Sequence, residues 1–184
     1  MLERDKKQYS DRSFQGTVTS SKGTRYEADS RVCDIYFAQH SEFPNTANIL
    51  QSLLIESYQH IYRGLDYSLF ADLQYVNYNE GGFFGKHHDV VPNGNGHDRF
   101  RALTMSVNLT NPEDYDGGDL IIYNGTKEVD RLDREKGSFI IIPAFFFHEV
   151  SKVQRGCREA IVTWLMTCSR DLDSFQKSII NKNS

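Results

Sequence analysis

The pattern of apolar and polar positions along the chain predicts one long helix followed by a series of short strands. Apolar residues recur at helical spacing between residues 45 and 63, and Gly64 provides a stop signal. The positions expected to recur on the buried face are Ile49, Leu53, Ile55, Tyr58 and Ile61. Shorter segments alternate or are uniformly apolar, as strands are: residues 32–37, 72–78, 83–89, 101–109, 117–123, 137–143 and 158–166.

Turn residues separate the predicted strands, and Asn124-Gly125 is typical of a hairpin. Many short strands after an early helix indicate a mainly β fold, a sandwich or open barrel with helices outside. Residues 1–30 are polar, which predicts a flexible or loosely packed start that could form a flap over a site. The polar tail after Cys168 predicts a last short helix. A length of 184 residues predicts a single domain over the whole chain.

Composition narrows the class of protein. Hydrophobic residues make up 39% of the chain and aromatic residues 12%, as in a folded globular protein. A net charge of −4 argues against a nucleic-acid-binding surface, because phosphate affinity depends on clustered Lys and Arg. The three cysteines are widely spaced and form no CxxC pair, which favours reduced thiols in a cytoplasmic protein. We expect no signal peptide and no membrane span, since no long apolar run occurs.

The strongest candidate chemistry lies in residues 73–89, where a strand would place His87 and Asp89 on one face. Side chains in a strand alternate, so His88 would point to the other face. The expected third ligand is His148, which follows the apolar run IIIPAFFF. Two imidazoles and one carboxylate with open positions opposite them are typical of non-haem Fe(II) oxygenases. A zinc hydrolase could use the same ligands, but no clear general base accompanies them.

A second candidate is Arg158, because the alternation of its strand would place it on one face with Ala160, Val162 and Trp164. An arginine that faces inward needs an anionic partner, since an unpaired buried charge is costly. Its planar fork binds a carboxylate through two hydrogen bonds. A bound dicarboxylate would supply that partner, and a distant acidic residue of the chain is the alternative.

Other conspicuous residues are interpreted as structural. Trp164 and residues 145–147 are expected to be core or rim packing, as aromatic residues after an apolar run usually are. Arg99 and Arg101 adjoin the loop 90–100. We interpret them as solvated loop charge in preference to groups that steer an acidic substrate.

Three motifs follow one another in the second half of the chain. The first is LQYVNYNEGGFFGKHHD (73–89), and the second is YDGGDL (115–120). The third runs from Gly137 through Ile142-Pro143 and His148 to Arg158 and Trp164. In this order they resemble the Fe(II)- and 2-oxoglutarate-dependent dioxygenases of the prolyl-hydroxylase-like branch, and most of all the PKHD-type hydroxylases of bacteria and phages. The resemblance implies a double-stranded β-helix, a cupin-like jelly roll, over about residues 70–168.

The resemblance also implies roles for individual residues. His87, Asp89 and His148 would hold Fe(II). Arg158 would bind the distal carboxylate of 2-oxoglutarate, and Tyr78 matches a tyrosine that contacts this co-substrate. These are the residues on which the implied site depends.

Asn108 is a candidate second contact to 2-oxoglutarate, although the family often carries a tyrosine there. The implied reaction consumes Fe(II)-activated O₂ and 2-oxoglutarate, releases succinate and CO₂, and is supported by ascorbate. Our leading hypothesis is hydroxylation of a peptidyl residue, with proline as the first candidate, by a bacterial or phage protein of the cytoplasm. The alternatives are the same chemistry on a small molecule or free amino acid, and a jelly-roll binding module without activity.

Overall fold

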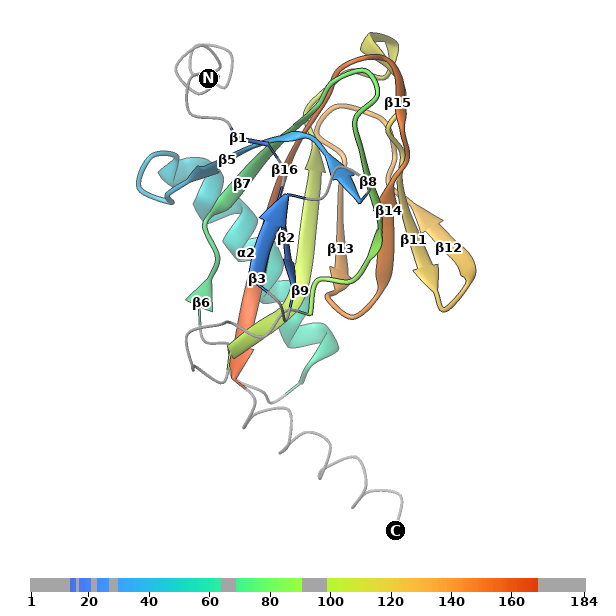
Figure 1. The fold of residues 1–184 in the computed structure, drawn as a ribbon. Helices are drawn as coiled ribbons and strands as arrows, with labels where there is room; N and C mark the ends of the chain where they lie inside the picture. The colour runs from blue at the N-terminus through green and yellow to red at the C-terminus, as the bar shows by residue number, and fades with distance from the viewer. Residues whose placement is uncertain are drawn as a thin grey trace.

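The computed structural model describes residues 14–15, 17–20, 23–26, 30–63, 69–90 and 99–168. Two antiparallel sheets make up most of this part of the chain (Figure 1). The first has the order β1 (Phe14–Gln15), β5 (Asp34–Ala38), β7 (Leu73–Tyr78), β16 (Arg158–Cys168), β9 (Arg99–Asn108) and β13 (Phe139–Pro143), and β6 (Leu69–Phe70) also pairs with β16. The second has the order β12 (Lys127–Arg131), β11 (Leu120–Asn124), β14 (Phe147–Val150), β8 (Phe83–His87) and β4 (Arg31–Val32).

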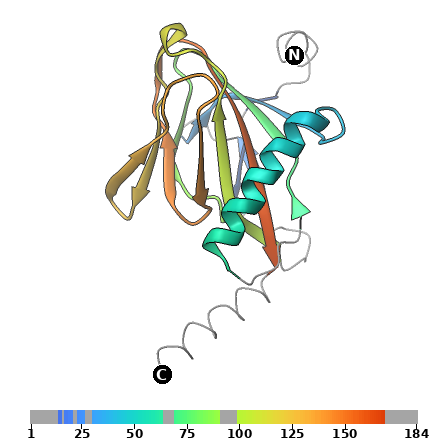
Figure 2. The same ribbon diagram turned by 180° about the vertical axis from the view of Figure 1, so that it is seen from behind.

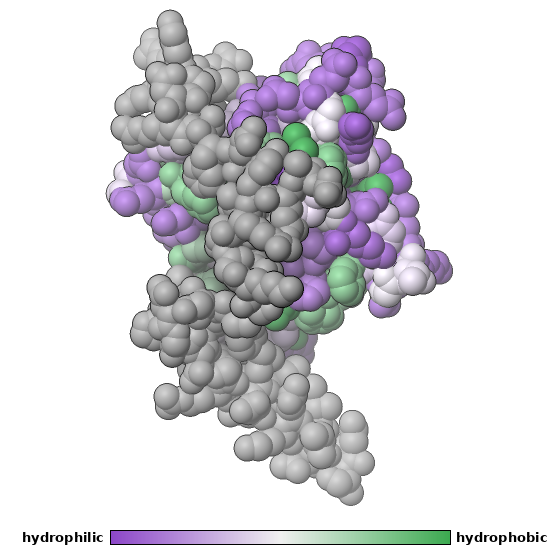
Figure 3. Space-filling model, viewed as in Figure 1, coloured by the Kyte–Doolittle hydropathy of each residue, from purple (hydrophilic) through white to green (hydrophobic). Residues whose placement is uncertain are grey.

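Two smaller antiparallel pairs complete the described strands: β10 (Tyr115–Gly117) with β15 (Val153–Gly156), and β2 (Thr17–Ser20) with β3 (Gly23–Tyr26). A short 3₁₀ turn, η2 (Pro112–Asp114), precedes β10. The architecture is the jelly roll that the sequence predicts, and the expected hairpin at Asn124-Gly125 joins β11 to β12. The hairpin is polar and exposed along β12, on the side of the molecule where hydrophilic residues dominate the described surface (Figure 3).

The helix α2 (Pro44–Ile61) covers the outer face of the first sheet, where it crosses β16 and β9 (Figure 2). Its buried residues are Ala47, Leu50, Leu54 and Tyr58. They pack against the outward-facing residues Leu73, Leu103, Met105, Ile161 and Leu165. No helix in the described ranges has the length and apolar character that a membrane crossing requires.

The helix itself is confirmed, but the expected buried stripe of α2 is only partly right, with Leu53 packed against the core as a partly buried residue. Tyr58 is buried as expected, but Ile49 is 62% exposed and Ile61 is 41% exposed. The helix carries more apolar residues than one stripe can hold, so contacts with the sheet decide which of them are buried. Those contacts select positions that include the small Ala47, which allows close approach.

The predicted strand over residues 32–37 proves to be two strands in different sheets. β4 ends at Val32 in the second sheet, and β5 begins at Asp34 in the first. Cys33 therefore marks the point where the chain crosses from one sheet to the other. The expected loose start before residue 30 contains the short strands β1, β2 and β3. The loop 91–98 and the tail after Cys168 lie outside the described residues.

A second apolar cluster lies between the two sheets. It combines Ile35, Val76 and Tyr78 of the first sheet with Ile122 and Val150 of the second. Because strand side chains alternate, each strand of the first sheet sends one set of residues to α2 and the other to the interior. The interior set is the one that lines the candidate site.

Candidate active site

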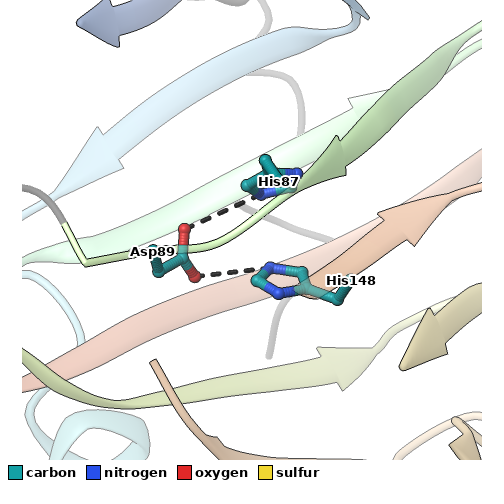
Figure 4. Close-up of side chains that lie close together, drawn as sticks. All are labelled: His87, Asp89 and His148. Carbon is teal, nitrogen blue, oxygen red and sulfur yellow. Dashed lines mark ion pairs between the residues drawn. The ribbon is translucent and has the colours of Figure 1, made fainter. Parts of the chain in front are cut away.

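The register of β8 and β14 brings the two histidines together. His148 lies directly opposite His87 across the antiparallel pair, and their ring centroids are 4.3 Å apart. Asp89 follows the end of β8, where its backbone N–H donates to the carbonyl of Ala144 at 2.8 Å and fixes the chain. One potential ligand atom from each of the three side chains lies within 4.8 Å of the others (Figure 4).

Backbone carbonyls set the orientation of both imidazole rings. The Nδ1 of His87 is 2.8 Å from the carbonyl oxygen of Gly85, and the Nδ1 of His148 is 3.1 Å from that of Phe146. A carbonyl can only accept, so each neutral ring carries its proton on Nδ1. Both Nε2 atoms face Asp89, at 3.7 Å and 3.4 Å from its oxygens, so neutral rings would offer their Nε2 lone pairs to a cation bound beside the carboxylate. This is the orientation in which ligating histidines are held in metal sites.

The carboxylate of Asp89 is buried and held by side chains of the first sheet. Thr104 Oγ1 donates to Oδ2 at 2.7 Å, and Trp164 Nε1 donates to the same oxygen at 3.0 Å. Thr104 and Trp164 face each other directly in the register of β9 and β16. Arg101 Nη1 lies 3.6 Å from Oδ1. The site thus has supporting residues from the sheet opposite its histidines.

Two of these supporting residues correct the sequence interpretation. Trp164 is buried, as expected of core packing, but it also donates to the carboxylate of Asp89. Arg101 was expected to be solvated charge beside the loop, yet it lines the cavity and its guanidinium lies over the ring of Trp164 at 3.7 Å. The alternation of side chains in β16 predicts that Trp164 faces inward. No comparable pattern in the sequence predicts the position of Arg101. His88 is exposed and lies edge-on to Phe147, as the choice of His87 requires.

The three groups shift one another's ionisation. Burial, and then the neighbouring His148, lower the pKa of His87 to about 4. Burial alone would raise the pKa of Asp89, but the hydrogen bond and charge of His148, with His87 and Arg101, hold it well below its usual range. Burial opposes the charged form of His148, but Asp89 raises its pKa above the ordinary value. The carboxylate is therefore ionised at neutral pH, as a metal ligand must be.

The three residues border a cavity of about 840 Å³ between the sheets. β16 lines it with Arg158, Ala160, Val162 and Trp164, the four residues that alternation places on one face. This confirms the predicted inward face of the strand. The inward residues of β9, Thr104 and Ser106, lie beside them.

Arg158 lies in this cavity, only 2% exposed and directly opposite Tyr78 in the pairing of β16 with β7. Its Nη2 is buried and has no hydrogen-bond partner among the described residues. No carboxylate in the described ranges lies within ion-pairing distance of the guanidinium, and burial lowers its pKa. Gly118, with φ +63°, leaves room for the stem, since a Cβ there would lie 3.2 Å from Cδ of Arg158. The geometry fits a site that is completed by an anion.

Tyr78 and Asn108, the other two expected contacts, occupy different environments. Tyr78 is 3% exposed and lines the cavity, and burial raises its pKa to about 12, so it is a neutral hydrogen-bonding group. The side-chain amide of Asn108 instead donates to the carbonyls of Thr110 at 2.9 Å and Arg134 at 2.6 Å. Asn108 does not line the cavity, so the structure does not bring it to the expected position.

Residues 73–166 match the family model of the 2OG-Fe(II) oxygenase superfamily. The chain belongs to this superfamily. A PKHD-type hydroxylase of Alteromonas mediterranea is 31% identical over 156 residues, which cover 78% of this chain and 68% of the relative. A PKHD-type hydroxylase of Shewanella frigidimarina is 30% identical over 139 residues, which cover 73% of this chain and 60% of that relative. These matches place the chain in the PKHD-type branch and identify it as an oxidoreductase.

Solved structures agree with the fold. A prolyl-4-hydroxylase of Pseudomonas putida superposes with a TM-score of 0.67 and 18% identity, over 89% of this chain and 81% of the other. A prolyl hydroxylase of Trichoplax adhaerens, solved with a hypoxia-inducible-factor peptide fragment, superposes with a TM-score of 0.66 and 20% identity, over 89% and 75%. At this identity the likeness establishes the jelly-roll fold of the superfamily oxygenases.

The superfamily uses Fe(II), 2-oxoglutarate and O₂, and the residues of this chain fit those groups. The cluster of two imidazole nitrogens and one carboxylate is the donor set of non-haem Fe(II) oxygenases. The buried Nη2 of Arg158, unpartnered among the described residues, fits the free carboxylate of a dicarboxylic co-substrate.

Proposed function

We propose that this protein is a dioxygenase that hydroxylates a peptidyl residue, with proline as the first candidate, while 2-oxoglutarate is converted to succinate and CO₂. The observation that carries this proposal is the convergence of His87, Asp89 and His148 within 4.8 Å, in a cavity that also holds Arg158. A binding module would have no need of an oriented donor set and a buried guanidinium in the same cavity.

In this proposal the Nε2 atoms of His87 and His148 and the carboxylate of Asp89 hold Fe(II). The metal supplies the activation of O₂ that is coupled to decarboxylation of 2-oxoglutarate. Thr104 and Trp164 both donate hydrogen bonds to Oδ2 of Asp89, so Oδ1 would be the oxygen offered to the metal. The protein thus fixes the direction of all three ligands before the metal binds.

Arg158 would bind the distal carboxylate of 2-oxoglutarate through its planar fork, and Tyr78 would donate its phenolic proton to the co-substrate. The two side chains are neighbours, with the guanidinium carbon 5.8 Å from the centre of the Tyr78 ring. Both are at least 97% buried, so water competes little for the bound carboxylate. Asn108 has no part in this proposal, because its amide is committed to backbone carbonyls.

Aromatic side chains at the cavity wall support a substrate with an apolar ring. Phe37 is 47% exposed and Phe147 is 39% exposed, although both line the cavity. Exposed aromatic residues beside a catalytic cavity favour contact with a ligand that covers them. The pyrrolidine ring of a peptidyl proline offers such a contact.

The test is to incubate the protein with Fe(II), ascorbate and 2-oxoglutarate, with and without proline-containing peptides. We expect succinate that depends on 2-oxoglutarate, and a gain of one oxygen atom on the peptide by mass spectrometry. His148→Ala should abolish both, whereas His60→Ala, at an exposed histidine of α2 on the outer face of the first sheet, should retain them. Turnover that does not depend on 2-oxoglutarate would contradict the proposal.

A further inference from the structure

A second guanidinium, that of Arg31, reaches into the cavity. Its charge and a hydrogen bond act on the phenol of Tyr78, where they oppose the increase in pKa that burial causes. Arg31 lies on β4, opposite Phe84 of β8, and is 6% exposed. Its guanidinium lies over the Phe84 ring at 4.3 Å, and that ring stacks on His87 at 3.6 Å. The group therefore lies one aromatic ring away from a proposed metal ligand.

The hydrogen-bond partners of this guanidinium are neutral. Nε donates to the sulfur of Cys33 at 3.0 Å, and Nη2 donates to Oε1 of Gln74 at 3.5 Å. No ion pair joins Arg31 to a carboxylate within the described ranges. A guanidinium cannot deprotonate in a protein, and a buried charge with only neutral partners is costly. The arrangement therefore favours an anion that arrives from outside the chain.

The charges of the residues that line the cavity also favour the binding of an anion from outside the chain. Its lining contains three arginines, Arg31, Arg101 and Arg158, against the single buried carboxylate of Asp89. Asp72 also borders the cavity but is exposed to solvent. Fe(II) carries two positive charges and 2-oxoglutarate carries two negative charges. Binding of both therefore leaves the net positive charge of the cavity lining unchanged. The chain as a whole carries a net charge of −4, so this excess is local.

Arg101 is a second guanidinium that could contact an anion bound by Arg31. Its side chain is 28% exposed, and it lies over the face of Trp164 with Nη1 near Asp89. Nη1 of Arg101 lies 3.6 Å from Oδ1 of Asp89, the oxygen that would ligate the metal. This contact is weak, so the other N–H groups of the guanidinium remain available to an anion. Two guanidinium groups on opposite walls of a cavity can hold one carboxylate between them.

We propose that Arg31, assisted by Arg101, binds a carboxylate of the substrate close to the carbon that is hydroxylated. This inference rests on the proposed function and names its substrate class, a substrate with an acidic group beside the reaction centre. Two sources offer that chemistry. One is an Asp or Glu next to the target residue of a peptide, and the other is the carboxylate of a free amino acid.

The test measures binding without turnover. The protein is loaded with 2-oxoglutarate and with Zn(II), which has no redox chemistry. Calorimetry then compares matched probes, namely capped peptides with Asp or Asn on either side of proline, and L-proline against L-prolinamide. Since hydrogen bonds to charged groups are stronger than those between neutral groups, the acidic member of one pair should bind at least about tenfold more tightly. The pair that shows the preference identifies the source.

Variants assign the preference to Arg31. Arg31→Gln should reduce the preference to less than about threefold, since the charged partner is lost. Arg155→Gln is the matched control, because Arg155 is exposed and pairs with Asp116 outside the cavity. It should leave the preference unchanged. Thermal unfolding of each variant shows whether it is folded.

Equal affinity for both members of every pair in the unmodified protein, or affinity for none of the probes, would overturn the inference without any variant. A loss of 2-oxoglutarate affinity in Arg31→Gln as large as that in Arg158→Gln would also overturn it, since Arg31 would then serve the co-substrate. The proposed function fails separately, through the absence of succinate formation that depends on Fe(II) and 2-oxoglutarate.

Discussion

At the scale of single residues, the candidate site depends on hydrogen bonds from one sheet to a carboxylate carried by the other. Thr104 and Trp164 bond the same oxygen of Asp89, and both lie on the inward faces of their strands. Such partners of a ligand orient it before the metal binds. Their contribution can be measured apart from that of the ligands themselves.

Thr104→Val removes one of these hydrogen bonds with almost no change in shape. We expect metal affinity to fall about tenfold or more, the range found for partners of metal ligands. Thr163→Val is the control, because Thr163 lies on the adjacent strand, donates to the carbonyl of Ala71 and does not line the cavity. It should lower stability and leave the metal dissociation constant unchanged. Equal metal affinity in both variants would contradict the role of Thr104.

Arg158→Lys keeps the charge but removes the planar fork. We expect 2-oxoglutarate to bind about tenfold more weakly, because a lysine cannot form the paired hydrogen bonds. Metal affinity measured without co-substrate should not change, since Arg158 contacts none of the three candidate ligands. Weakened metal binding together with normal 2-oxoglutarate binding would show that this arginine has another task.

At the scale of elements, the strand alternation in the sequence predicts the site well where both faces of a strand have distinct chemistry. β16 is such a strand, and the inward face of Arg158, Ala160, Val162 and Trp164 follows from its pattern. The motif residues His87, Asp89 and His148 also converge as predicted.

The remaining cavity residues could not be predicted because they depend on contacts between distant segments. Arg31 faces the cavity because the chain crosses between sheets at Cys33, and only pairing with β8 and β7 reveals that crossing. Arg101 follows a segment that reads as a loop, yet β9 extends back to Arg99. The buried stripe of α2 likewise depends on how the sheet beneath it is packed.

The helix should contribute stability and not chemistry. Leu54 is fully buried between α2 and the outer face of the first sheet, so Leu54→Ala should cost about 2–5 kcal/mol of unfolding free energy. Ile49→Ala, at a position that is 62% exposed, should cost less than about 1 kcal/mol. Urea unfolding measures both. Metal affinity should be unchanged in each folded variant, since α2 covers the face away from the cavity.

At the scale of the whole molecule, stability should decline in alkali as buried tyrosines resist ionisation. The pKa of Tyr78 is raised to about 12 in the folded chain from an ordinary value of 10. Above pH 10 the unfolded state loses this proton first, so the free energy of unfolding falls as pH rises toward 12. The loss from this residue is of the order of 3 kcal/mol.

Tyr78→Phe should remove that part of the decline, because phenylalanine has no proton to lose. Urea unfolding of both proteins at a series of alkaline pH values gives the comparison. An identical decline in the two proteins would show that the phenol of Tyr78 is not the group that titrates. Tyr62, whose pKa burial also raises to about 12, would then be the next residue to replace.

We propose that two histidines and an aspartate hold one metal, and that a 2-oxoglutarate molecule anchored by Arg158 completes the metal site. Anaerobic calorimetry with Fe(II), followed by 2-oxoglutarate, tests this proposal most directly. We predict one Fe(II) per chain, 2-oxoglutarate binding that requires the metal, and loss of both in His148→Ala but not in His60→Ala. Fe(II) binding that survives in His148→Ala, or that is lost equally in His60→Ala, would contradict the claim.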